Sequence, residues 1–390
     1  MHSKRKLAII STHPIQYNAP LFQLLAQRSI IDIRVFYTWG KSVLETKYDP
    51  GFGKVITWDI PLLKDYAHQF EENIADDPGS HHFRGIDNPN LIKNIESWGA
   101  DAILVYGWSY RSHLKAMRHF HGKIPVLFRG DSTLLDAAGG GSKALARKLF
   151  LRWVYRHIDH ALFVGKANRT YFEAMGLQSQ QLHFAPHAID NQRFGVSVDR
   201  TFRRSLGFAE NEVVYLFAGK LETKKNPALL IRAFAALQQP NTRLWLVGNG
   251  PLESELNDLI LSLPLQTQAL IHHTPFVNQL DMPAVYQSAD VFVLPSKGPG
   301  ETWGLAVNEA MSSGLPVIVS DRCGCASDLV EPGVNGWMFN SDDKDSLMES
   351  MKKLTDWQVI KEMGKKSREH IAPWNFTQIA EVIENLVVHS

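Results

Sequence analysis

The chain has 390 residues, of which 44% are hydrophobic and 21% are charged, and its 41 basic and 40 acidic residues leave a net charge of +1. A single hydrophobic core seldom grows beyond about 250 to 300 residues, so this length predicts two domains. The near-zero charge argues against a nucleic-acid partner, because nucleic-acid-binding domains usually carry a basic excess. The composition is that of an ordinary globular protein and excludes a disordered or low-complexity chain.

Short apolar runs separated by helix-like stretches fill the first half of the chain. These runs lie at 7–12, 31–38, 102–107, 125–131, 160–165 and 182–187. Runs that are apolar throughout are typical of parallel strands buried on both faces of a sheet. They predict a first doubly wound, Rossmann-like domain over residues 1–188.

The same pattern begins again after a polar segment at 187–207, which we interpret as the linker between the halves. Five further apolar runs follow, at 212–220, 242–250, 268–276, 289–296 and 315–321. Alternation of strands and helices is typical of doubly wound α/β folds, and it predicts a second domain over 189–371. The last segment, 372–390, contains an amphipathic helix.

The N-terminus and the cysteines bear on the compartment. The first apolar run, Leu7 to Ile10, is too short for the core of a secretory signal peptide, and no later segment approaches the length of a membrane span. Cys323 and Cys325 are too few for a disulfide scaffold or a four-ligand zinc site. We therefore expect a cytoplasmic protein.

A lysine-rich turn follows the first strand of the second half. Ligands of open parallel sheets bind beyond the carboxyl ends of the strands, so residues in such turns are candidates for a site. Lys220, Lys224 and Lys225 stand just before a helix that opens at Pro227. Ammonium groups beside a helix N-terminus favour an anion such as a diphosphate. The alternative is a solvated basic turn.

Two common nucleotide-binding motifs are missing from the sequence. The turn at Gly248 and Gly250 opens like a dinucleotide fingerprint, but Glu253 follows where a third glycine is required. A P-loop is also absent, because no Gly-Lys-Ser/Thr combination has the required spacing. A nicotinamide oxidoreductase is thus disfavoured, although a Gly-x-Gly turn still lets a ligand approach the backbone closely.

The stretch SKGPGETWGLAVNEAMSSGLPVIVSD, at 296–321, places Glu301 in a glycine-rich turn and Glu309 in the helix that follows. A carboxylate can accept a hydrogen bond from each hydroxyl of a vicinal diol, so the two glutamates predict a site for polyols such as a ribose and a sugar. The glycines allow a tight turn that leads backbone N–H groups to the helix start. These donors belong to Thr302, Trp303, Gly304 and Leu305.

Together these stretches resemble the donor-nucleotide domain of retaining GT-B glycosyltransferases of family 4. The resemblance covers most of residues 210–340 and rests on AGKLETKKN, VGNGP, YQSADVFVLPS, ETWGLAVNEAMSSGLPVIVSD and LVEPGVNGWMF. The first half resembles the family more loosely, through STHPIQYNAPLF, which is similar to members found in bacterial polysaccharide assembly. The resemblance implies an α/β, GT-B fold of two Rossmann-like domains facing a cleft, with the helix in 372–390 crossing back to the first domain.

The resemblance also implies roles for individual residues. Glu301 would contact the transferred sugar, and Glu309 would hold the nucleotide ribose. Lys220 and Lys225 would neutralise the diphosphate, so that neither a metal ion nor another cofactor is expected. The remaining donor-binding residues would border the base or lie at the helix start: Gly248, Asn249, Phe276, Val277, Thr302, Trp303, Gly304 and Leu305. For Phe276 and Val277 the alternative is packing of a loop onto the domain.

The first half departs from the family pattern in two places. Ser11-Thr12-His13-Pro14 stands where members often have a glycine-rich loop, and Phe128-Arg129-Gly130-Asp131 stands where they often have a His-Asp pair. His13 and Arg129 are the two candidates for the missing histidine. The acceptor is expected near His13, Tyr17, Trp108, Arg129 and Asp131, and for each of them the alternative is a structural role.

The implied activity is transfer of a hexose, with glucose the best guess, from a UDP-sugar to a glycan or lipid-linked glycan in polysaccharide biosynthesis. A basic amphipathic helix at 142–157 predicts peripheral contact with the inner face of the membrane, the alternative being a solvated basic face. Two other functions stay open. A GT-B nucleotide-sugar epimerase would consume a UDP-sugar without an acceptor, and a non-catalytic nucleotide-sugar-binding protein would bind it without turnover.

Overall fold

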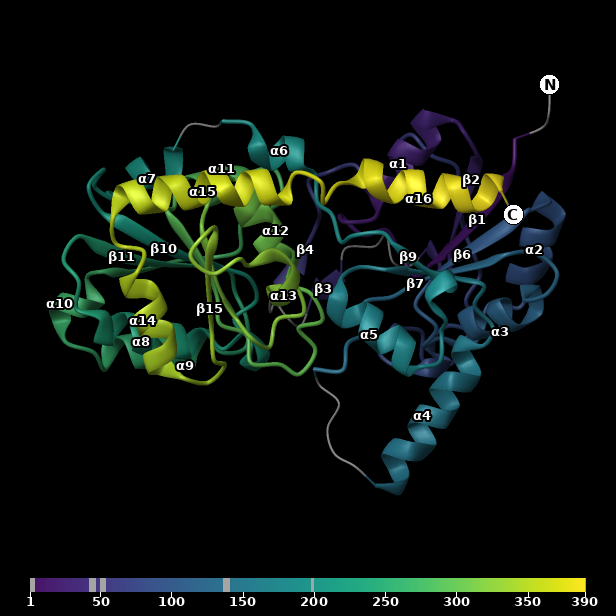
Figure 1. The fold of residues 1–390 in the computed structure, drawn as a ribbon, viewed down its shortest axis with the longest axis horizontal. Coiled ribbons are helices and arrows are strands. Elements are labelled where there is room, and N and C mark those ends of the chain that lie inside the picture. Colours follow the sequence, from purple (N-terminus) through teal and green to yellow (C-terminus); the bar gives the residue numbers. More distant parts are fainter. Residues whose placement is uncertain (1–3, 42–46, 50–53, 136–140, 198–199, 390) are drawn as a thin grey trace. The chain divides into compact units, whose positions relative to one another are not determined.

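The structure, a computed structural model, describes residues 4–41, 47–49, 54–135, 141–197 and 200–389. The chain forms two compact units (Figure 1). The first contains Met1–Lys47, Pro61–His187 and Phe376–Ser390, and the second contains Tyr48–Ile60 and Ala188–Asn375. This division differs from the expected continuous domains of 1–188 and 189–371, because a short segment of the first half packs with the second unit.

A parallel sheet forms the centre of the first unit. Among the described residues it has seven strands in the order β5-β2-β1-β6-β7-β8-β9. The strands are β1 (Lys6–Ser11), β2 (Asp32–Tyr37), β5 (His68–Phe70), β6 (Ala102–Tyr106), β7 (Val126–Arg129), β8 (His160–Phe163) and β9 (Leu182–Phe184). All but β5 coincide with predicted runs. Strand β5 was missed because its three residues, HQF, are not an apolar run.

Helices cover this first sheet and bury its apolar side chains. They are α1 (Ala19–Arg28), α2 (Leu91–Trp98), α3 (Arg111–Phe120), α4 (Ser142–Tyr155), α5 (Lys166–Ala174) and α16 (Phe376–Val388), with short 3-10 turns η2 (Phe83–Gly85) and η3 (Ser179–Gln181). The C-terminal helix α16 packs on α1, where Arg28 Nη2 lies 2.9 Å from Glu384 Oε2. Its apolar face, with Ile379 and Ile383, is fully buried in the first unit.

The second unit repeats the plan. Its described sheet has six parallel strands in the order β12-β11-β10-β13-β14-β15. They are β10 (Val213–Ala218), β11 (Thr242–Val247), β12 (Ile271–Thr274), β13 (Val291–Leu294), β14 (Val317–Ser320) and β15 (Gly336–Phe339). Strands β3 (Lys47–Asp49) and β4 (Lys54–Ile56) form a separate two-stranded sheet. The five predicted runs correspond to β10 to β14.

The helices of the second unit alternate with its strands, as expected for a doubly wound fold. They are α6 (Asn191–Gly195), α7 (Thr201–Ser205), η4 (Thr223–Lys225), α8 (Pro227–Leu237), α9 (Glu253–Leu261), α10 (Leu265–Gln268), α11 (Met282–Gln287), α12 (Leu305–Ser312), α13 (Ala326–Leu329), α14 (Lys344–Lys352) and α15 (Trp357–Ile371). In the part of the chain that the structure describes, no helix is long and apolar enough to cross a bilayer.

Within the segment 187–207, which we expected to be a linker, the described residues after His187 belong to the second unit. They form α6 and α7, and the side chain of Arg203 is completely buried. Arg203 Nη1 and Arg200 Nη2 each lie 2.8 Å from the carboxylate of Asp290, which is also buried. The prediction failed because the charges that suggested solvent exposure are paired inside the unit.

Candidate functional site

The candidate donor site lies at the carboxyl ends of the strands in the second sheet. Strands β10 and β13 are neighbours at its centre, and the chain leaves them in opposite directions, toward β11 and β12 on one side and β14 and β15 on the other. Such a switch point is where open α/β sheets bind ligands. The connection after β10 carries Lys225, and the connection after β13 carries Glu301.

These two connections meet in an ion pair. Lys225 Nζ lies 2.6 Å from Glu301 Oε2, and the side chains are only 16% and 7% exposed. The hydroxyl of Ser296 donates a second hydrogen bond, 3.0 Å long, to the same carboxylate oxygen. Lys297 N donates to the carbonyl of Lys224 at 2.8 Å, which joins the two loops through their backbones. The site therefore holds a positive and a negative group, both largely desolvated and in fixed positions.

The turn before α12 is held by the connection after β14. A Cβ atom on Gly324 would lie 1.7 Å from the carbonyl oxygen of Thr302, so only glycine permits this approach. Gly324 N donates to the carbonyl of Glu301, and Cys325 N donates to that of Trp303. The predicted helix start is confirmed: Gly304, with φ +103°, caps α12, which begins at Leu305. The first N–H groups of a helix lack intrahelical acceptors and suit an oxygen-rich ligand.

Both cysteines lie under this turn as buried free thiols. Burial raises the pKa of Cys323 to about 12, and the nearby Glu301 carboxylate adds to the rise. Burial also raises the pKa of Cys325 well above its ordinary value. Both side chains are thus neutral packing groups near pH 7.

The second glutamate lies deeper. Glu309, in α12, is 3% exposed, and its Oε2 accepts a 2.8 Å hydrogen bond from the hydroxyl of Tyr286 in α11. Tyr286 is fully buried. Sequence analysis did not name Tyr286 as a site residue, although it opens the stretch YQSADVFVLPS on which the resemblance partly rests, because nothing local pairs it with Glu309. The side chain of Trp303 has a structural contact as well, since its Nε1 donates a 2.8 Å hydrogen bond to Asn308 Oδ1.

The turns after β10 and β11 pack backbone against backbone. A Cβ on Gly248 would lie 2.1 Å from the carbonyl oxygen of Gly219. Asn249 then links this turn to its neighbours, because its Oδ1 accepts from Phe276 N at 2.7 Å and its Nδ2 donates to Glu253 at 2.8 Å. Glu253, the residue that breaks the dinucleotide fingerprint, therefore holds Asn249 in place.

A residue from the first half of the sequence joins this part of the second unit. The ring of Trp58 meets that of Phe276 edge on, with centroids 6.4 Å apart. Asn278 Nδ2 donates to the carbonyl of Thr57 at 2.8 Å. Val277 is half-buried beside Phe276. Sequence reasoning missed Trp58, because more than two hundred positions separate it from Phe276 and no local pattern links them.

The expected acceptor-side residues lie in the first unit. His13 Nδ1 is 2.8 Å from Thr12 Oγ1, and its ring meets Trp39 at 5.2 Å between centroids. Tyr17 is half-buried in the turn before α1. Trp108 packs on the core, and its ring meets that of Phe150 in α4 at 5.8 Å. Trp108 therefore has a structural contact at the base of α4.

Arg129 has a structural position as well. Its side chain is buried and donates to the carbonyls of Ala185 and Pro186 at 2.8 and 2.9 Å. Asp131, in contrast, forms an ion pair of 3.6 Å with His187 Nε2. Burial lowers the pKa of His187, and Asp131 partly offsets the change. A His-Asp pair thus exists in the first unit. Sequence reasoning did not find this pair, because its histidine follows β9 and its aspartate follows β7.

Several known proteins are similar to parts of this chain. Residues 198–370 match the family described as "Glycosyl transferases group 1". An uncharacterized glycosyltransferase of Methanocaldococcus jannaschii is 34% identical over 40% of this chain and 39% of its own length. A UDP-Gal:alpha-D-GlcNAc-diphosphoundecaprenol alpha-1,3-galactosyltransferase of Escherichia coli is 28% identical over 68% of this chain and 72% of its own length.

Solved structures resemble the whole chain. Anabaena HepE in complex with UDP superimposes with a TM-score of 0.74 over 100% of both chains, at 18% sequence identity. A sucrose-phosphate synthase from Thermosynechococcus elongatus gives 0.73 over 99% of both, also at 18% identity. At these identities the likeness shows the fold alone. The chain therefore has the GT-B fold of two parallel-sheet, Rossmann-like domains, and residues 198–370 carry the group 1 pattern.

Proposed function

We propose that the protein is a retaining glycosyltransferase that moves a hexose, with glucose as the first candidate, from a UDP-sugar to a glycan or lipid-linked glycan in polysaccharide biosynthesis. The buried pair of Lys225 and Glu301 at the switch point carries the proposal. The name of the Escherichia coli relative gives a UDP-sugar as donor and a diphosphoundecaprenol-linked sugar as acceptor. The Anabaena structure holds UDP.

In this proposal the two lysines bind the donor diphosphate. Lys220 follows β10 directly, and Lys225 stands before the N-terminus of α8. A diphosphate between them replaces Glu301 as the partner of Lys225. Fixed cations of this kind stabilise the charge that develops on the leaving diphosphate, without a metal ion in the donor site.

Glu301, released from Lys225, accepts hydrogen bonds from hydroxyls of the transferred sugar. Glu309, held by Tyr286, accepts from the hydroxyls of the ribose. The turn with Asn249, together with Phe276 and Trp58, borders the base. Each role uses a side chain that the second unit already holds in position, which lowers the cost of ordering on binding.

Transfer then proceeds on one face of the sugar. The bond between the anomeric carbon and the diphosphate oxygen breaks, and a bond from the acceptor oxygen forms on the same face, which gives retention. The proton of the acceptor hydroxyl passes to the departing diphosphate. Rate enhancement rests on positioning and on stabilisation of the leaving group.

Helix α4 supports the membrane part of the proposal. Every residue from Gly141 to Phe150 is exposed, and α4 stands off the body of its unit (Figure 1). Leu145 and Leu149 are 60% and 58% exposed among basic side chains. Apolar residues interleaved with cations suit the interface of an anionic membrane, where a lipid-linked acceptor resides.

A donor panel tests the function. The protein is incubated with UDP-glucose, UDP-galactose, UDP-N-acetylglucosamine or GDP-mannose, without acceptor, and thermal shift and release of nucleoside diphosphate are followed with and without EDTA. We expect stabilisation and slow hydrolysis of one UDP-sugar in both conditions. Conversion of the donor into an epimer would instead identify an epimerase. Binding without turnover, even with polysaccharide acceptors, would favour a binding protein.

Two substitutions separate the roles of the glutamates. We expect Glu301→Ala to reduce turnover far more than UDP affinity, and Glu309→Ala to reduce UDP affinity itself. Glu255→Ala, on the exposed face of α9, is the matched control. Equal losses of turnover and affinity in Glu301→Ala would contradict its role at the sugar, and unchanged UDP affinity in Glu309→Ala would contradict the ribose assignment.

A further inference from the structure

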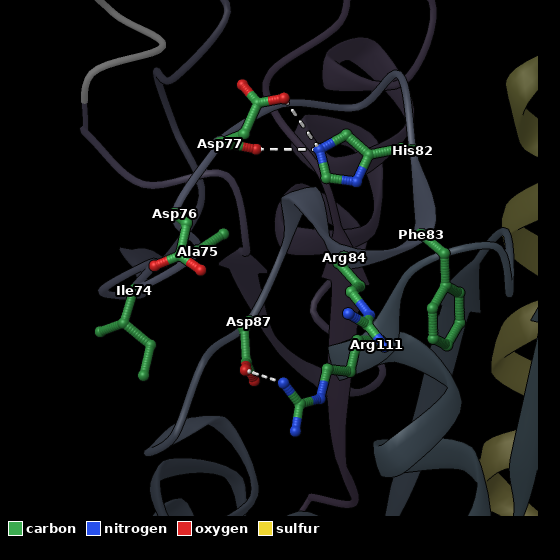
Figure 2. A pocket seen from close by; sticks show the side chains of 9 residues that line it. All are labelled: Ile74, Ala75, Asp76, Asp77, His82, Phe83, Arg84, Asp87 and Arg111. Carbon is green, nitrogen blue, oxygen red and sulfur yellow. Dashed lines mark hydrogen bonds and ion pairs between the residues drawn. The ribbon is translucent and has the colours of Figure 1, made fainter.

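A cavity of about 610 Å³ lies in the first unit, apart from the residues of the candidate donor site. The loop between β5 and α2 supplies most of its wall, and Arg111 at the start of α3 supplies the rest. Figure 2 shows Asp77 and His82 together at one end and the pair of Asp87 and Arg111 at the other. Nothing in the proposed transfer reaction uses these residues.

Two imidazoles converge on one carboxylate oxygen at this end of the cavity. His81 Nε2 lies 3.1 Å from Asp77 Oδ2, and His82 Nε2 lies 3.3 Å from the same atom. The three ligand atoms all lie within 4.8 Å of one another. Among the residues that the structure describes, no other group of three or more such side chains is as close. The backbone carbonyl of Asp77 lies 3.0 Å from His82 Nε2 and is a second oxygen beside this group.

These distances suit a metal ion. Zn²⁺ binds imidazole nitrogen and carboxylate oxygen at about 2.0 to 2.2 Å, so neighbouring ligand atoms in a tetrahedral site lie about 3.3 Å apart. The measured separations from Asp77 Oδ2 to the two histidines match this value. A cation between the three atoms would replace the two hydrogen-bonding protons that now connect them.

The backbone holds the two histidines in place. The loop closes where Gly79 N donates to the carbonyl of Gly85 at 3.0 Å. A Cβ on Gly85 would lie 2.2 Å from the carbonyl oxygen of Gly79, so the closure requires glycine there. The ring of His81 packs directly over Gly79, where a Cβ would lie 2.4 Å from its Nδ1. Asn73 Nδ2 donates to the carbonyl of Gly85 at 2.9 Å and fixes the loop from below.

The charged groups at the cavity, three carboxylates and three cations with Lys115 included, balance one another. Asp87 is neutralised by Arg111 at 2.6 Å and by Lys115 at 3.3 Å. Asp76 and Asp77 contribute two further carboxylates to the wall, and Arg84 contributes one guanidinium. The histidines are the natural partners of Asp77, and they are uncharged when they bind a metal.

We propose that Asp77, His81 and His82 form a binding site for a divalent transition metal, with Zn²⁺ as the ion that the ligands suit best. Three protein ligands leave at least one coordination position for water or for an oxygen atom of a molecule in the adjoining cavity. The site lies within the first unit and does not depend on the proposed transfer reaction. Its occupancy is therefore measurable whether or not the donor assignment is correct.

Metal titration of the full chain tests the proposal. The protein is stripped with EDTA, transferred to metal-free buffer and titrated with ZnCl2 against a chromophoric chelator. CoCl2 is used in parallel, because bound Co²⁺ reports its ligands by visible absorption. The variants are His82→Ala, which removes a ligand, and Gly79→Ala, which removes none but displaces the ring of His81. His119→Ala is the control, since His119 pairs with Glu96 at 2.6 Å outside any three-ligand group in the described chain.

We expect one Zn²⁺ per wild-type chain. The affinity should fall about 10- to 100-fold or more in His82→Ala and Gly79→Ala, and stay unchanged in His119→Ala. Equal affinity in wild type, His82→Ala and Gly79→Ala would overturn the proposal, because binding would then belong to other histidines. Loss of the site in His119→Ala, or absence of stoichiometric binding by the wild-type chain, would overturn it as well.

Discussion

Replacement of Lys225 by methionine probes the pair on which the donor site rests. Lys225 Nζ is 2.6 Å from Glu301 Oε2, and both side chains are largely buried. Removal of one partner of a buried ion pair costs about 3 to 5 kcal/mol, because the other charge stays behind without compensation. Since the hydroxyl of Ser296 still donates to Glu301, we expect the lower end, about 3 kcal/mol. For a unit of this size that corresponds to a fall in Tm of roughly 6 to 12 °C.

The assay is a double-mutant cycle with Lys225→Met, Glu301→Gln and the double variant, followed by urea unfolding and calorimetry of the second unit. Glutamine keeps a partner for Ser296 and removes the stranded charge, so the double variant should cost about 1 to 3 kcal/mol less than the sum of the single variants. Lys224→Met is the control, because Lys224 is 37% exposed and its contact with Glu222 is 3.5 Å. Single-variant costs that add to within about 0.5 kcal/mol would refute the coupling on which this reasoning rests.

Three further outcomes follow from the structure. Gly248→Ala should lower the free energy of unfolding by over 1 kcal/mol more than Gly207→Ala does. Both glycines have positive φ, but a Cβ meets a backbone oxygen only at Gly248. Urea unfolding of the two variants checks this. Burial lowers the pKa of His113 from 6.5 to about 4. Its contribution to the free energy of unfolding is therefore complete above pH 6.5 and should fall by about 1.4 kcal/mol per pH unit as the pH drops toward 4. In a His113→Gln variant, the free energy of unfolding should depend less steeply on pH over this range. Replacement of Arg147 and Lys148 in α4 by glutamine should weaken co-sedimentation with anionic vesicles by about 1 kcal/mol per charge, and unchanged co-sedimentation would remove the membrane contact.

Much of the fold could be predicted because its strands are apolar on both faces. Strand β10, VVYLFA, is buried at every position, and such a run is visible without any alignment. Strand β5 could not be predicted, since it lies at the sheet edge and is half-exposed. The charged segment with Arg203 was misread for a related reason. The local sequence shows that Arg203 is charged. It does not show that Arg203 forms a buried ion pair with Asp290, which lies far along the chain.

The same distinction applies to the residues of the candidate site: those marked by the local sequence were predicted, and those with distant partners were missed. Lys225, Glu301 and Gly248 stand just after strands, where the rule for parallel sheets directs attention, and the structure does bring the first two together. Trp58 and His187 were missed because their partners are distant in sequence. Arg129 was a candidate for the missing histidine, but its guanidinium binds two backbone carbonyls of its own unit.

The contact between Lys225 and Glu301 also explains how two buried charges can be stable in a site without a charged ligand. Two desolvated charges of opposite sign stabilise each other while the donor is absent, so neither is left uncompensated. In the function that we propose, a diphosphate is a stronger partner for the lysine, because it offers several anionic oxygens at the start of α8. Its binding would separate Glu301 from Lys225 and leave the carboxylate available to the sugar hydroxyls. The cost of separating the pair is then offset by two new sets of charge-assisted hydrogen bonds, and a nucleotide without its sugar supplies only one of them.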